Sequence, residues 1–249
     1  MSDHVLIDNI GGVLTLTLNR PEKMNALTAE MYATLGRAID EAEETTEVRC
    51  IVLQANGDSF TAGNDLSEFA AFNAREIDRA TGNPLLAALA RASTPIVAAV
   101  QGRAVGVGTT MLLHCDLVFV AEDALLSTPF VNLALVPEAA SSILLPARIG
   151  HTRAFAMFVL GESIDSRTAV AWGLANAVMP AAELHARARA VAEAIAARPP
   201  AAVAITKRLM RDAAAIQARI AEESRHFAAQ LRSDEAREAF AAFQLKRGG

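Results

Sequence analysis

Hydrophobic and polar residues alternate twice near the start of the chain, over residues 5–8 and 13–18. A side-chain period of two is typical of a β-strand with one buried face. Gly11 and Gly12 between the two runs provide the turn residues of a hairpin. After Thr28, a residue type that favours helix N-caps, apolar residues return at helical spacing: Met31, Leu35, Ile39 and Ala42. The opening segment therefore predicts a β-hairpin followed by an amphipathic helix.

Three short apolar runs follow, over residues 48–55, 95–100 and 116–121, and each predicts a buried strand. A helical stretch that ends at Arg91 lies between the first two runs. Strands that alternate with helices indicate an α/β fold whose strands pair mostly in parallel. From about Ser141 onward the pattern is almost entirely helical.

Two prolines, Pro199 and Pro200, interrupt the helical pattern near the end of the chain, because proline lacks the N–H that continues a helix. The residues after them carry alternating charges and a thin apolar stripe, formed by Leu209, Ile216, Ile220, Phe227 and Leu231. So narrow a stripe is too small for an independent core. We therefore predict a body over residues 1–198 and a helical region over residues 199–249 that packs on the body or on another subunit.

The composition places the chain among globular proteins, with 249 residues, 52% hydrophobic and 20% charged. A formal net charge of −5 provides no positive field for nucleic acid, so we expect no such partner. The most apolar region, residues 95–113, is interrupted by Gln101 and Arg103, and no membrane span is expected. The first residues also lack the features of a secretory signal. A cytoplasmic protein is predicted, with Cys50 and Cys115 as reduced structural thiols.

The usual metal and phosphate motifs are missing from the sequence. The five histidines are scattered without metal-binding spacing, so no metal site is expected. Residues 114–116, a His-Cys-Asp cluster, are interpreted as a packed junction between a helix and a strand. Gly102, Gly106 and Gly108 fit neither the dinucleotide-binding nor the Walker pattern. These glycines either let a helix pack closely against a strand or leave backbone N–H groups free to reach a ligand.

Two segments together carry a specific signal: SFTAGNDLSEF at residues 59–69 and AVQGRAVGVGTTMLLHCDLVFVAEDALLSTPF at residues 99–130. With these segments, and with RPEKMNALT at 20–28 and EAFAAFQLKR at 238–247, the chain resembles the crotonase, or enoyl-CoA hydratase/isomerase, superfamily over nearly its whole length. The resemblance implies an α/β fold built as a ββα spiral with a C-terminal helical oligomerisation region. It also implies a homotrimer or dimer of trimers that acts on an acyl-CoA thioester, with no cofactor besides the substrate's own coenzyme A.

In this family each of the two segments contributes one backbone N–H to an oxyanion hole for the thioester carbonyl. The matching donors in this chain are Asn64 and Val107. Gly63 and Gly106 beside them would let the main chain come close to the acyl-CoA. A helix N-terminus adds a positive dipole end where enolate charge develops.

Crotonase-type hydratases are known for two glutamates, and this chain has Thr110 and Phe130 at those positions. Neither side chain activates water or protonates carbon at neutral pH, which argues against hydration. A carboxylate, Glu138, follows in STPFVNLALVPEAASS. This stretch resembles the peroxisomal-type delta(3),delta(2)-enoyl-CoA isomerases, which use a single catalytic glutamate, although Ala139 stands where their pattern has glycine.

The resemblance implies that Glu138 removes a proton alpha to the thioester and returns it at the gamma carbon. Apolar neighbours are expected to raise the pKa of Glu138 and make it a better base. They include Phe130, Leu133, Leu135 and Val136. The alternative is an ordinary loop glutamate that caps the helix predicted to begin near Ser141.

Contacts with coenzyme A are also implied by the resemblance. Backbone of the family's AG-x-D loop holds the adenine and ribose, which corresponds to Ala62, Asp65 and Leu66, and Gly63, Gly106 and Phe130 belong to the same substrate site. Basic residues approach the phosphates, and the candidates here are Lys23 and, less directly, Lys207 or Lys246. A solvated surface charge is the alternative for each lysine.

These observations predict an enzyme that converts a 3-enoyl-CoA into trans-2-enoyl-CoA, in the β-oxidation of unsaturated acyl chains. A second hypothesis keeps the fold but assigns hydration, decarboxylation or another enolate reaction. A third, consistent with the missing glutamate pair, is a non-catalytic protein that binds acyl-CoA or acts as a scaffold.

Overall fold

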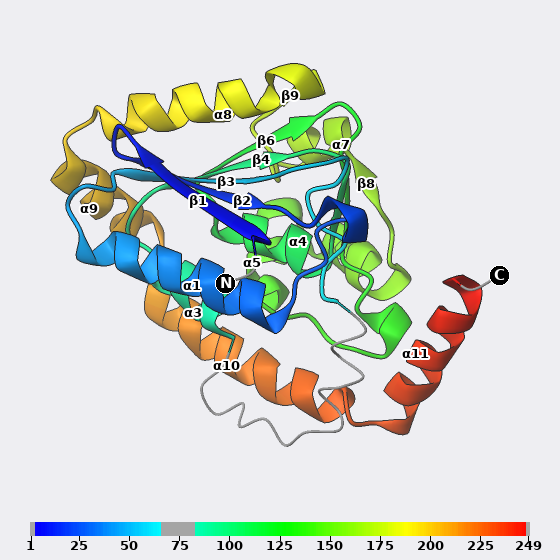
Figure 1. Cartoon of the computed structure of the whole chain (residues 1–249). Coiled ribbons are helices and arrows are strands. Elements are labelled where there is room, and N and C mark those ends of the chain that lie inside the picture. Colours follow the sequence, from blue (N-terminus) through cyan, green and yellow to red (C-terminus); the bar gives the residue numbers. More distant parts are fainter. Residues whose placement is uncertain (1–2, 66–82, 248–249) are drawn as a thin grey trace.

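The computed structural model describes residues 3–65 and 83–247. Within them, a six-stranded sheet has the order β1-β2-β3-β4-β6-β9 (Figure 1). Within this sheet only β1 and β2 pair antiparallel, and the other neighbouring strands pair in parallel, as the sequence predicts. The strands are β1 (Val5–Ile10), β2 (Val13–Leu18), β3 (Cys50–Ala55), β4 (Ile96–Val100), β6 (Leu117–Ala121) and β9 (Ala177–Met179).

The predicted hairpin is confirmed, and its first strand runs two residues further than the alternation indicated. Gly11 and Gly12 form its turn with φ angles of +61° and +81°, a conformation that residues with a side chain rarely adopt. The predicted helix is α1 (Ala29–Glu44), and the Thr28 side chain caps it by accepting a hydrogen bond from the Met31 N–H.

Both faces of the sheet are covered, which explains the continuous apolar runs in the central strands. Helix α8 (Ala181–Ala196) lies along one face, with Leu184, Ala188 and Ala192 buried against the sheet. On the opposite face lie α1 and α3 (Pro84–Arg91), over the larger part of the core (Figure 1).

A smaller sheet corrects the expectation that the chain is almost wholly helical after Ser141. It contains β5 (Arg103–Val105), β7 (Leu125–Ser127) and β8 (Ile164–Asp165), and β9 extends the main sheet. Strands of two or three residues are too short to show a hydrophobic period. Contacts with residues far away in the sequence position such a strand instead. For β9, the Asn176 N–H donates to the Val118 carbonyl of β6, and the Val118 N–H donates to Asn176 Oδ1.

Short helices connect these strands and surround the small sheet. They are α4 (Val107–Thr110), α5 (Ser141–Ile149), α6 (His151–Phe155) and α7 (Ser166–Ala171), the π-helix Ala156–Leu160, and the 3-10 turns Pro21–Lys23, Met111–His114 and Val131–Leu133. Among the residues that the structure describes, no helix combines the length and apolarity needed to cross a membrane.

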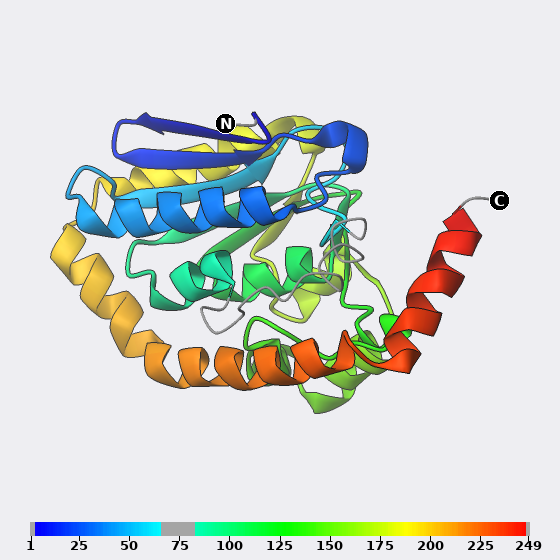
Figure 2. The same cartoon turned by 60° about the horizontal axis from the view of Figure 1, so that its bottom comes forward.

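Three helices follow the proline pair and run in an arc around the body (Figure 2): α9 (Pro200–Met210), α10 (Ala213–Gln230) and α11 (Asp234–Arg247). Ile216, Ile220 and Leu231 of the predicted stripe are buried, and Phe227 packs against the same core. Leu209 is a correction, because it is 83% exposed. Lys207 occupies the buried side of α9, and Leu209, two positions later, points about 200° away from Lys207 around the helix axis.

The junction at residues 114–116 is packed, as predicted. Cys50 and Cys115 are buried free thiols, and burial, with the negative charge of Asp116, raises the pKa of each to about 12. The described residues contain no group of three His, Cys, Asp or Glu side chains that could hold a metal ion.

Candidate active site

The loop that contains Asn64 lies alongside β5. The Thr61 N–H donates to the Arg103 carbonyl at 2.9 Å, and the Val105 N–H donates to the Thr61 carbonyl at 3.0 Å. Gly63 has a φ of +87°, and a Cβ added there would lie 2.8 Å from the Val105 carbonyl oxygen. The loop therefore reaches this position only because Gly63 has no side chain.

The glycines after β5 have two different roles. Gly106, with φ +57° and ψ −116°, turns the chain from β5 into α4 and faces the Phe130 ring. Gly108 lies against the neighbouring loop, since an added Cβ would lie 2.5 Å from the Thr61 methyl carbon. Both predicted explanations therefore apply: Gly108 serves close packing, and Gly106 opens the backbone to a pocket.

The backbone N–H groups of Asn64 and Val107 donate no hydrogen bond to any part of the chain that the structure describes. Val107 is the first residue of α4, where an N–H has no acceptor within the helix. Asn64 lies between two engaged amides, since Gly63 donates to the Thr61 hydroxyl and Asp65 donates to the Leu27 carbonyl. Free amides of this kind can bind an anionic oxygen.

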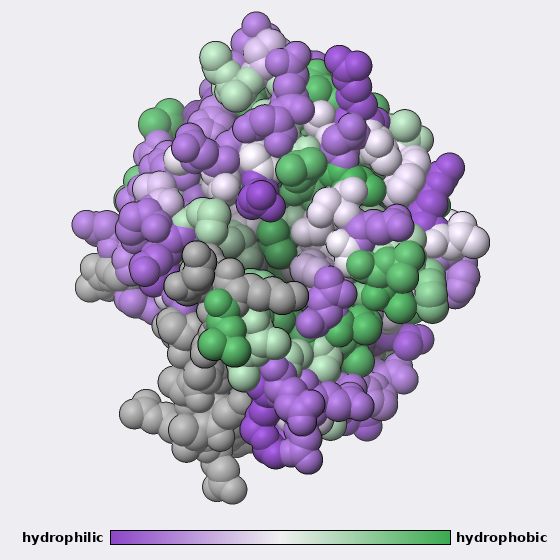
Figure 3. Space-filling model, turned by 90° about the vertical axis from the view of Figure 1, so that its right-hand side faces the viewer, coloured by the Kyte–Doolittle hydropathy of each residue, from purple (hydrophilic) through white to green (hydrophobic). Residues whose placement is uncertain are grey.

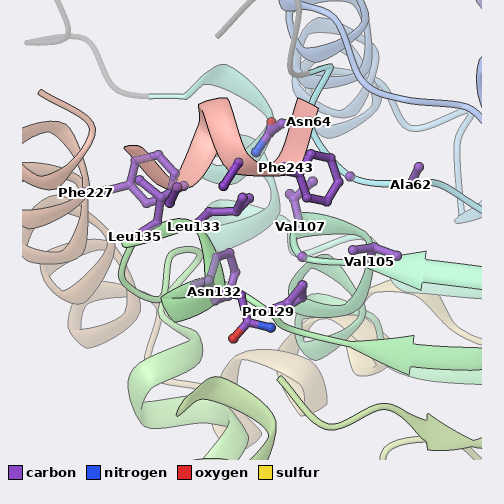
Figure 4. Close-up of a pocket in the computed structure, with 15 residues that line it drawn as sticks. Ala62, Asn64, Val105, Val107, Pro129, Asn132, Leu133, Leu135, Phe227 and Phe243 are labelled. Carbon is purple, nitrogen blue, oxygen red and sulfur yellow. The ribbon is translucent and has the colours of Figure 1, made fainter. Parts of the chain in front are cut away.

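Both residues line a pocket of about 460 Å³ with an apolar wall. Figure 3 shows apolar residues around a hollow on this side of the molecule. Figure 4 shows Phe227 and Phe243, from α10 and α11, in the same pocket as Asn64 and Val107. The other lining residues are Ala62, Gly63, Val105, Gly106, Pro129, Phe130, Asn132, Leu133, Leu135, Ala239 and Ala242. The C-terminal helices therefore form part of the wall.

Glu138 lies in the turn before α5 and is 9% exposed. Its Oε1 accepts a hydrogen bond from the Thr110 hydroxyl at 2.5 Å, and Thr110 lies three residues after Val107 on α4. Burial raises the pKa of Glu138 to about 7; the Thr110 hydroxyl opposes this rise, and the charge of Glu223 adds to it. The carboxylate is thus held by Thr110, where the family resemblance places a hydratase glutamate, on the same short helix as the Val107 amide. Glu138 itself is not among the residues that line the described pocket.

Glu138 does not cap α5, so that alternative is wrong. The residue at the N-cap position is Ala140, and its N–H and that of Ser142 are both bound by the carboxylate of Glu223. Ala139 and Ala140 have φ angles of +61° and +55°. The alanine that replaces glycine in the family pattern therefore adopts the left-handed conformation of a glycine, at a cost of roughly 1–2 kcal/mol.

The predicted coenzyme A contacts are placed unequally. Ala62, Gly63, Gly106 and Phe130 line the pocket. The Asp65 carboxylate instead pairs with Arg20 at 2.6 Å and braces the loop, and Leu66 lies outside the described residues.

The three lysines also differ. Lys23 is exposed. It lies next to the loop that contains Ala62, as shown by the hydrogen bond from the Ala62 N–H to the carbonyl of the following residue, Met24. Lys207 is a correction: it is only 7% exposed and its Nζ binds Asp116 and the Thr94 carbonyl, each at 2.8 Å. The charge of Lys207 is therefore paired with Asp116, the residue before β6, and not with a ligand. The Lys246 side chain lies outside the described part of the chain.

Tyr32 and Glu223 belong to the site although the sequence analysis did not select them. The Tyr32 hydroxyl donates to Asn64 Oδ1 at 2.6 Å, and burial, with the charge of Glu138, raises the pKa of Tyr32 well above its ordinary value. Tyr32 lies on the buried face of α1, so its sequence pattern is that of a core residue. Its position as the only tyrosine in the chain is the one signal that could have selected it.

A comparison with family models matches residues 8–248 to the family described as "Enoyl-CoA hydratase/isomerase". The chain belongs to the enoyl-CoA hydratase/isomerase family. An enoyl-CoA hydratase/isomerase structure from Pseudoalteromonas atlantica superposes on it with a TM-score of 0.92 and 40% sequence identity, covering 98% of this chain and 97% of that one. The fold of this family member is therefore of the crotonase type, as predicted.

Curated relatives of this chain carry both isomerase and hydratase names. The 1,2-epoxyphenylacetyl-CoA isomerase of Escherichia coli is 32% identical over 226 residues, which cover 86% of this chain and 84% of the relative. Enoyl-CoA delta isomerase 2 of Rattus norvegicus is 32% identical over 216 residues, which cover 84% of this chain and 55% of the longer rat protein.

Proposed function

We propose that this family member shifts the double bond of a 3-enoyl-CoA to give trans-2-enoyl-CoA by a single-base 1,3-proton transfer. The observation that carries the proposal is the buried carboxylate of Glu138, which is bound by Thr110 on the same short helix, α4, that presents the Val107 amide. The positions that hold the hydratase glutamates are Thr110 and Phe130. An isomerase name among the relatives, the rat delta isomerase, agrees with this choice.

The reaction needs two kinds of group. Glu138 takes the proton from the alpha carbon, and the Asn64 and Val107 amides bind the thioester oxygen while the dienolate is present. Glu138 then returns the proton to the gamma carbon, so proton and electron pair both balance without a further cofactor. With a pKa of about 7, about half of the Glu138 carboxyls are ionised at neutral pH and ready to act as a base.

Hydration is the second candidate reaction, and the side chains around Glu138 weigh against it. Adding water across a double bond needs one group to activate the water and another to protonate carbon. The Thr110 hydroxyl already donates to Glu138, and the Phe130 ring is apolar. Glu138 alone would have to perform both tasks.

The proposal extends to the coenzyme A contact, the oligomeric state and the metabolic role. Lys23 is the proposed phosphate contact, since it is exposed beside the Ala62 loop. A homotrimer or dimer of trimers is supported by large apolar side chains exposed on α9, which are Ile205, Leu209 and Met210. A role in β-oxidation of unsaturated acyl chains would follow from the product, which is the substrate form that β-oxidation consumes.

The decisive test compares Glu138→Gln with a matched control, Glu122→Gln, at an exposed glutamate outside the site. We expect Glu138→Gln to lower turnover of trans-3-hexenoyl-CoA by at least about 100-fold, because the base is removed, while acyl-CoA binding by calorimetry stays within about twofold. Glu122→Gln should behave as wild type.

Three outcomes would contradict the proposal. Turnover retained by Glu138→Gln would exclude Glu138 as the base. Hydration of crotonyl-CoA faster than isomerisation by the wild type would favour the hydratase hypothesis. Tight acyl-CoA binding without deuterium exchange at the alpha carbon would favour a non-catalytic binding protein.

A further inference from the structure

The turn that carries Glu138 is strained. Ala139 and Ala140 both adopt left-handed φ angles, which are unfavourable for residues with a Cβ. Such a conformation persists only where the surroundings hold it in place. The contacts that hold this turn therefore also fix the direction of the Glu138 side chain toward Thr110.

One contact comes from α10. The buried Glu223 carboxylate, 6% exposed, accepts from the Ala140 N–H at 2.6 Å and from the Ser142 N–H at 2.9 Å. These are orphan amides at the start of α5, and a charged acceptor binds them more strongly than a neutral one. Glu223 thus pins the residues that follow Glu138 from more than eighty residues away in the chain.

A second contact comes from the other side of the turn. The His114 Nε2 lies 2.7 Å from the Ala139 carbonyl, so it carries the proton and donates. His114 Nδ1 is then an acceptor, and the Arg211 guanidinium donates to it at 2.5 Å. Burial, with the positive charge of Arg211, lowers the pKa of His114 to about 3 and keeps the ring neutral. Arg211 belongs to the segment between α9 and α10.

We propose that the C-terminal helical region positions the catalytic base: Glu223 directly, and Arg211 through His114, hold the turn of residues 138–140 so that the Glu138 carboxylate meets Thr110. This inference rests on the proposed function, in which Glu138 is the base. Glu223 and Arg211 are positioning residues, because Glu223 binds backbone N–H groups of the turn and Arg211 binds His114, which binds the Ala139 carbonyl.

The same helix links the base to the pocket. Phe227 lies four residues after Glu223 on α10, on the same side of the helix, and lines the pocket. A ligand that contacts Phe227 therefore contacts the element that holds Glu138. The region that the sequence analysis assigned to oligomerisation would also serve the chemistry.

Glu223 also acts on Glu138 through its charge. The groups whose charges or hydrogen bonds affect Glu138 are Thr110 on α4 and Glu223 on α10, and Tyr32 on α1 is in turn affected by the charge of Glu138. The Tyr32 phenol stays neutral because its pKa is well above the ordinary value. Burial raises the pKa of Glu223, while its hydrogen bonds from Ser142 and Ala140 and the charge of Arg219 on α10 oppose this rise. Removing the charge of Glu223 should therefore lower the pH at which Glu138 ionises.

The test is Glu223→Gln, with Glu222→Gln as the matched control at the neighbouring, half-exposed position on the same helix. The amide side chain of this variant offers one acceptor oxygen for two backbone N–H groups. We expect kcat for the 3-enoyl-CoA to fall about 10- to 100-fold through misplacement of the base, with KM nearly unchanged and the inflection of the pH–rate profile at lower pH. Glu222→Gln releases Arg219 but keeps the Glu223 carboxylate and its two hydrogen bonds, so kcat and KM should stay at their wild-type values.

Carbon-13 NMR titration of the Glu138 carboxyl and hydrogen exchange at Ala140 and Ser142 test the inference without any turnover. If the wild type fails to isomerise, the proposed function fails while these readouts still test the positioning. In Glu223→Gln, a Glu138 titration and an amide protection that both match the wild type would overturn the inference. A lower kcat in Glu223→Gln with an unmoved Glu138 titration would also overturn it, because Glu223 would then serve only the stability of the fold.

Glu223→Asp provides a second variant if Glu223→Gln does not fold. The shorter side chain keeps the charge but cannot reach both amides. We expect the pH inflection to stay near that of the wild type while kcat falls. Full wild-type kcat in Glu223→Asp would overturn the inference.

Discussion

Removing the hydroxyl of Thr110 isolates the contact that favours the ionised form of Glu138, the proposed base. In Thr110→Val the side chain keeps its shape, and the 2.5 Å hydrogen bond to Glu138 Oε1 is lost. Since that bond opposes the rise in the pKa of Glu138, its loss should make the carboxyl ionise at higher pH. The variant should therefore need more alkaline conditions to act as a base.

The size of the effect follows from the burial of the pair. A hydrogen bond to a charged group contributes about 1.5–3 kcal/mol, and one pH unit corresponds to about 1.4 kcal/mol. The inflection of the pH–rate profile should therefore move up by about 1 to 2 pH units. At pH 7 the ionised fraction then falls from about half to about 1–10%, which lowers kcat/KM about 5- to 50-fold.

The assay is kcat/KM for a 3-enoyl-CoA across the pH range in which the variant stays folded, judged by circular dichroism. At high pH, where Glu138 is fully ionised in both proteins, Thr110→Val should recover wild-type activity or exceed it, because a more basic carboxylate is the stronger base. Thr110→Ser keeps the hydroxyl and should retain the wild-type inflection. An inflection that stays in place, or moves to lower pH, would refute this reasoning.

Two further measurements address the oxyanion hole and the energetic cost of the base. Val107→Pro removes one amide donor at the first position of a helix, where proline is tolerated, and should lower kcat about 100- to 1,000-fold in the isomerisation assay. Val107→Ala keeps the N–H and should lose far less activity. Equal losses in the two variants would exclude Val107 as a donor. Glu138 holds its proton more tightly when folded, so the folded state loses stability as the pH rises from 4.5 to about 7. When urea unfolding is measured above pH 7, Glu138→Gln should therefore be more stable than the wild type, by up to about 3 kcal/mol in unfolding free energy. At low pH the variant should show no such gain, and an equal gain at both pH values would contradict the pKa of Glu138.

Local patterns in the sequence determined most of the scaffold. The hairpin at Gly11 and Gly12, the cap of α1 at Thr28 and the buried central strands depend on neighbouring residues, whose spacing and turn chemistry are visible in one dimension. The family motifs also located the loop of Asn64 and the turn before Val107, because the conformations of Gly63 and Gly106 favour glycine and are therefore visible in the sequence.

Contacts between distant segments decided the rest. The sequence pattern around Lys207 is that of a surface charge, and only tertiary packing brings α9 close enough to the start of β6 for Lys207 to bind Asp116. Tyr32 reads as a core residue until the fold brings Asn64 to its hydroxyl. Glu223 lies on a helix of alternating charge, and nothing in its neighbours marks the amides of Ala140 and Ser142 as its partners.

The proton affinity of Glu138 has the same origin. Its apolar neighbours predict the direction of the pKa change, but the value of about 7 depends on how deeply the turn is buried, on Thr110 and on Glu223. The sequence by itself thus determined which elements form and which carboxylate to consider. Tertiary structure decided how that carboxylate is held and how strongly it binds a proton, because burial and charge act through distances that only the folded chain defines.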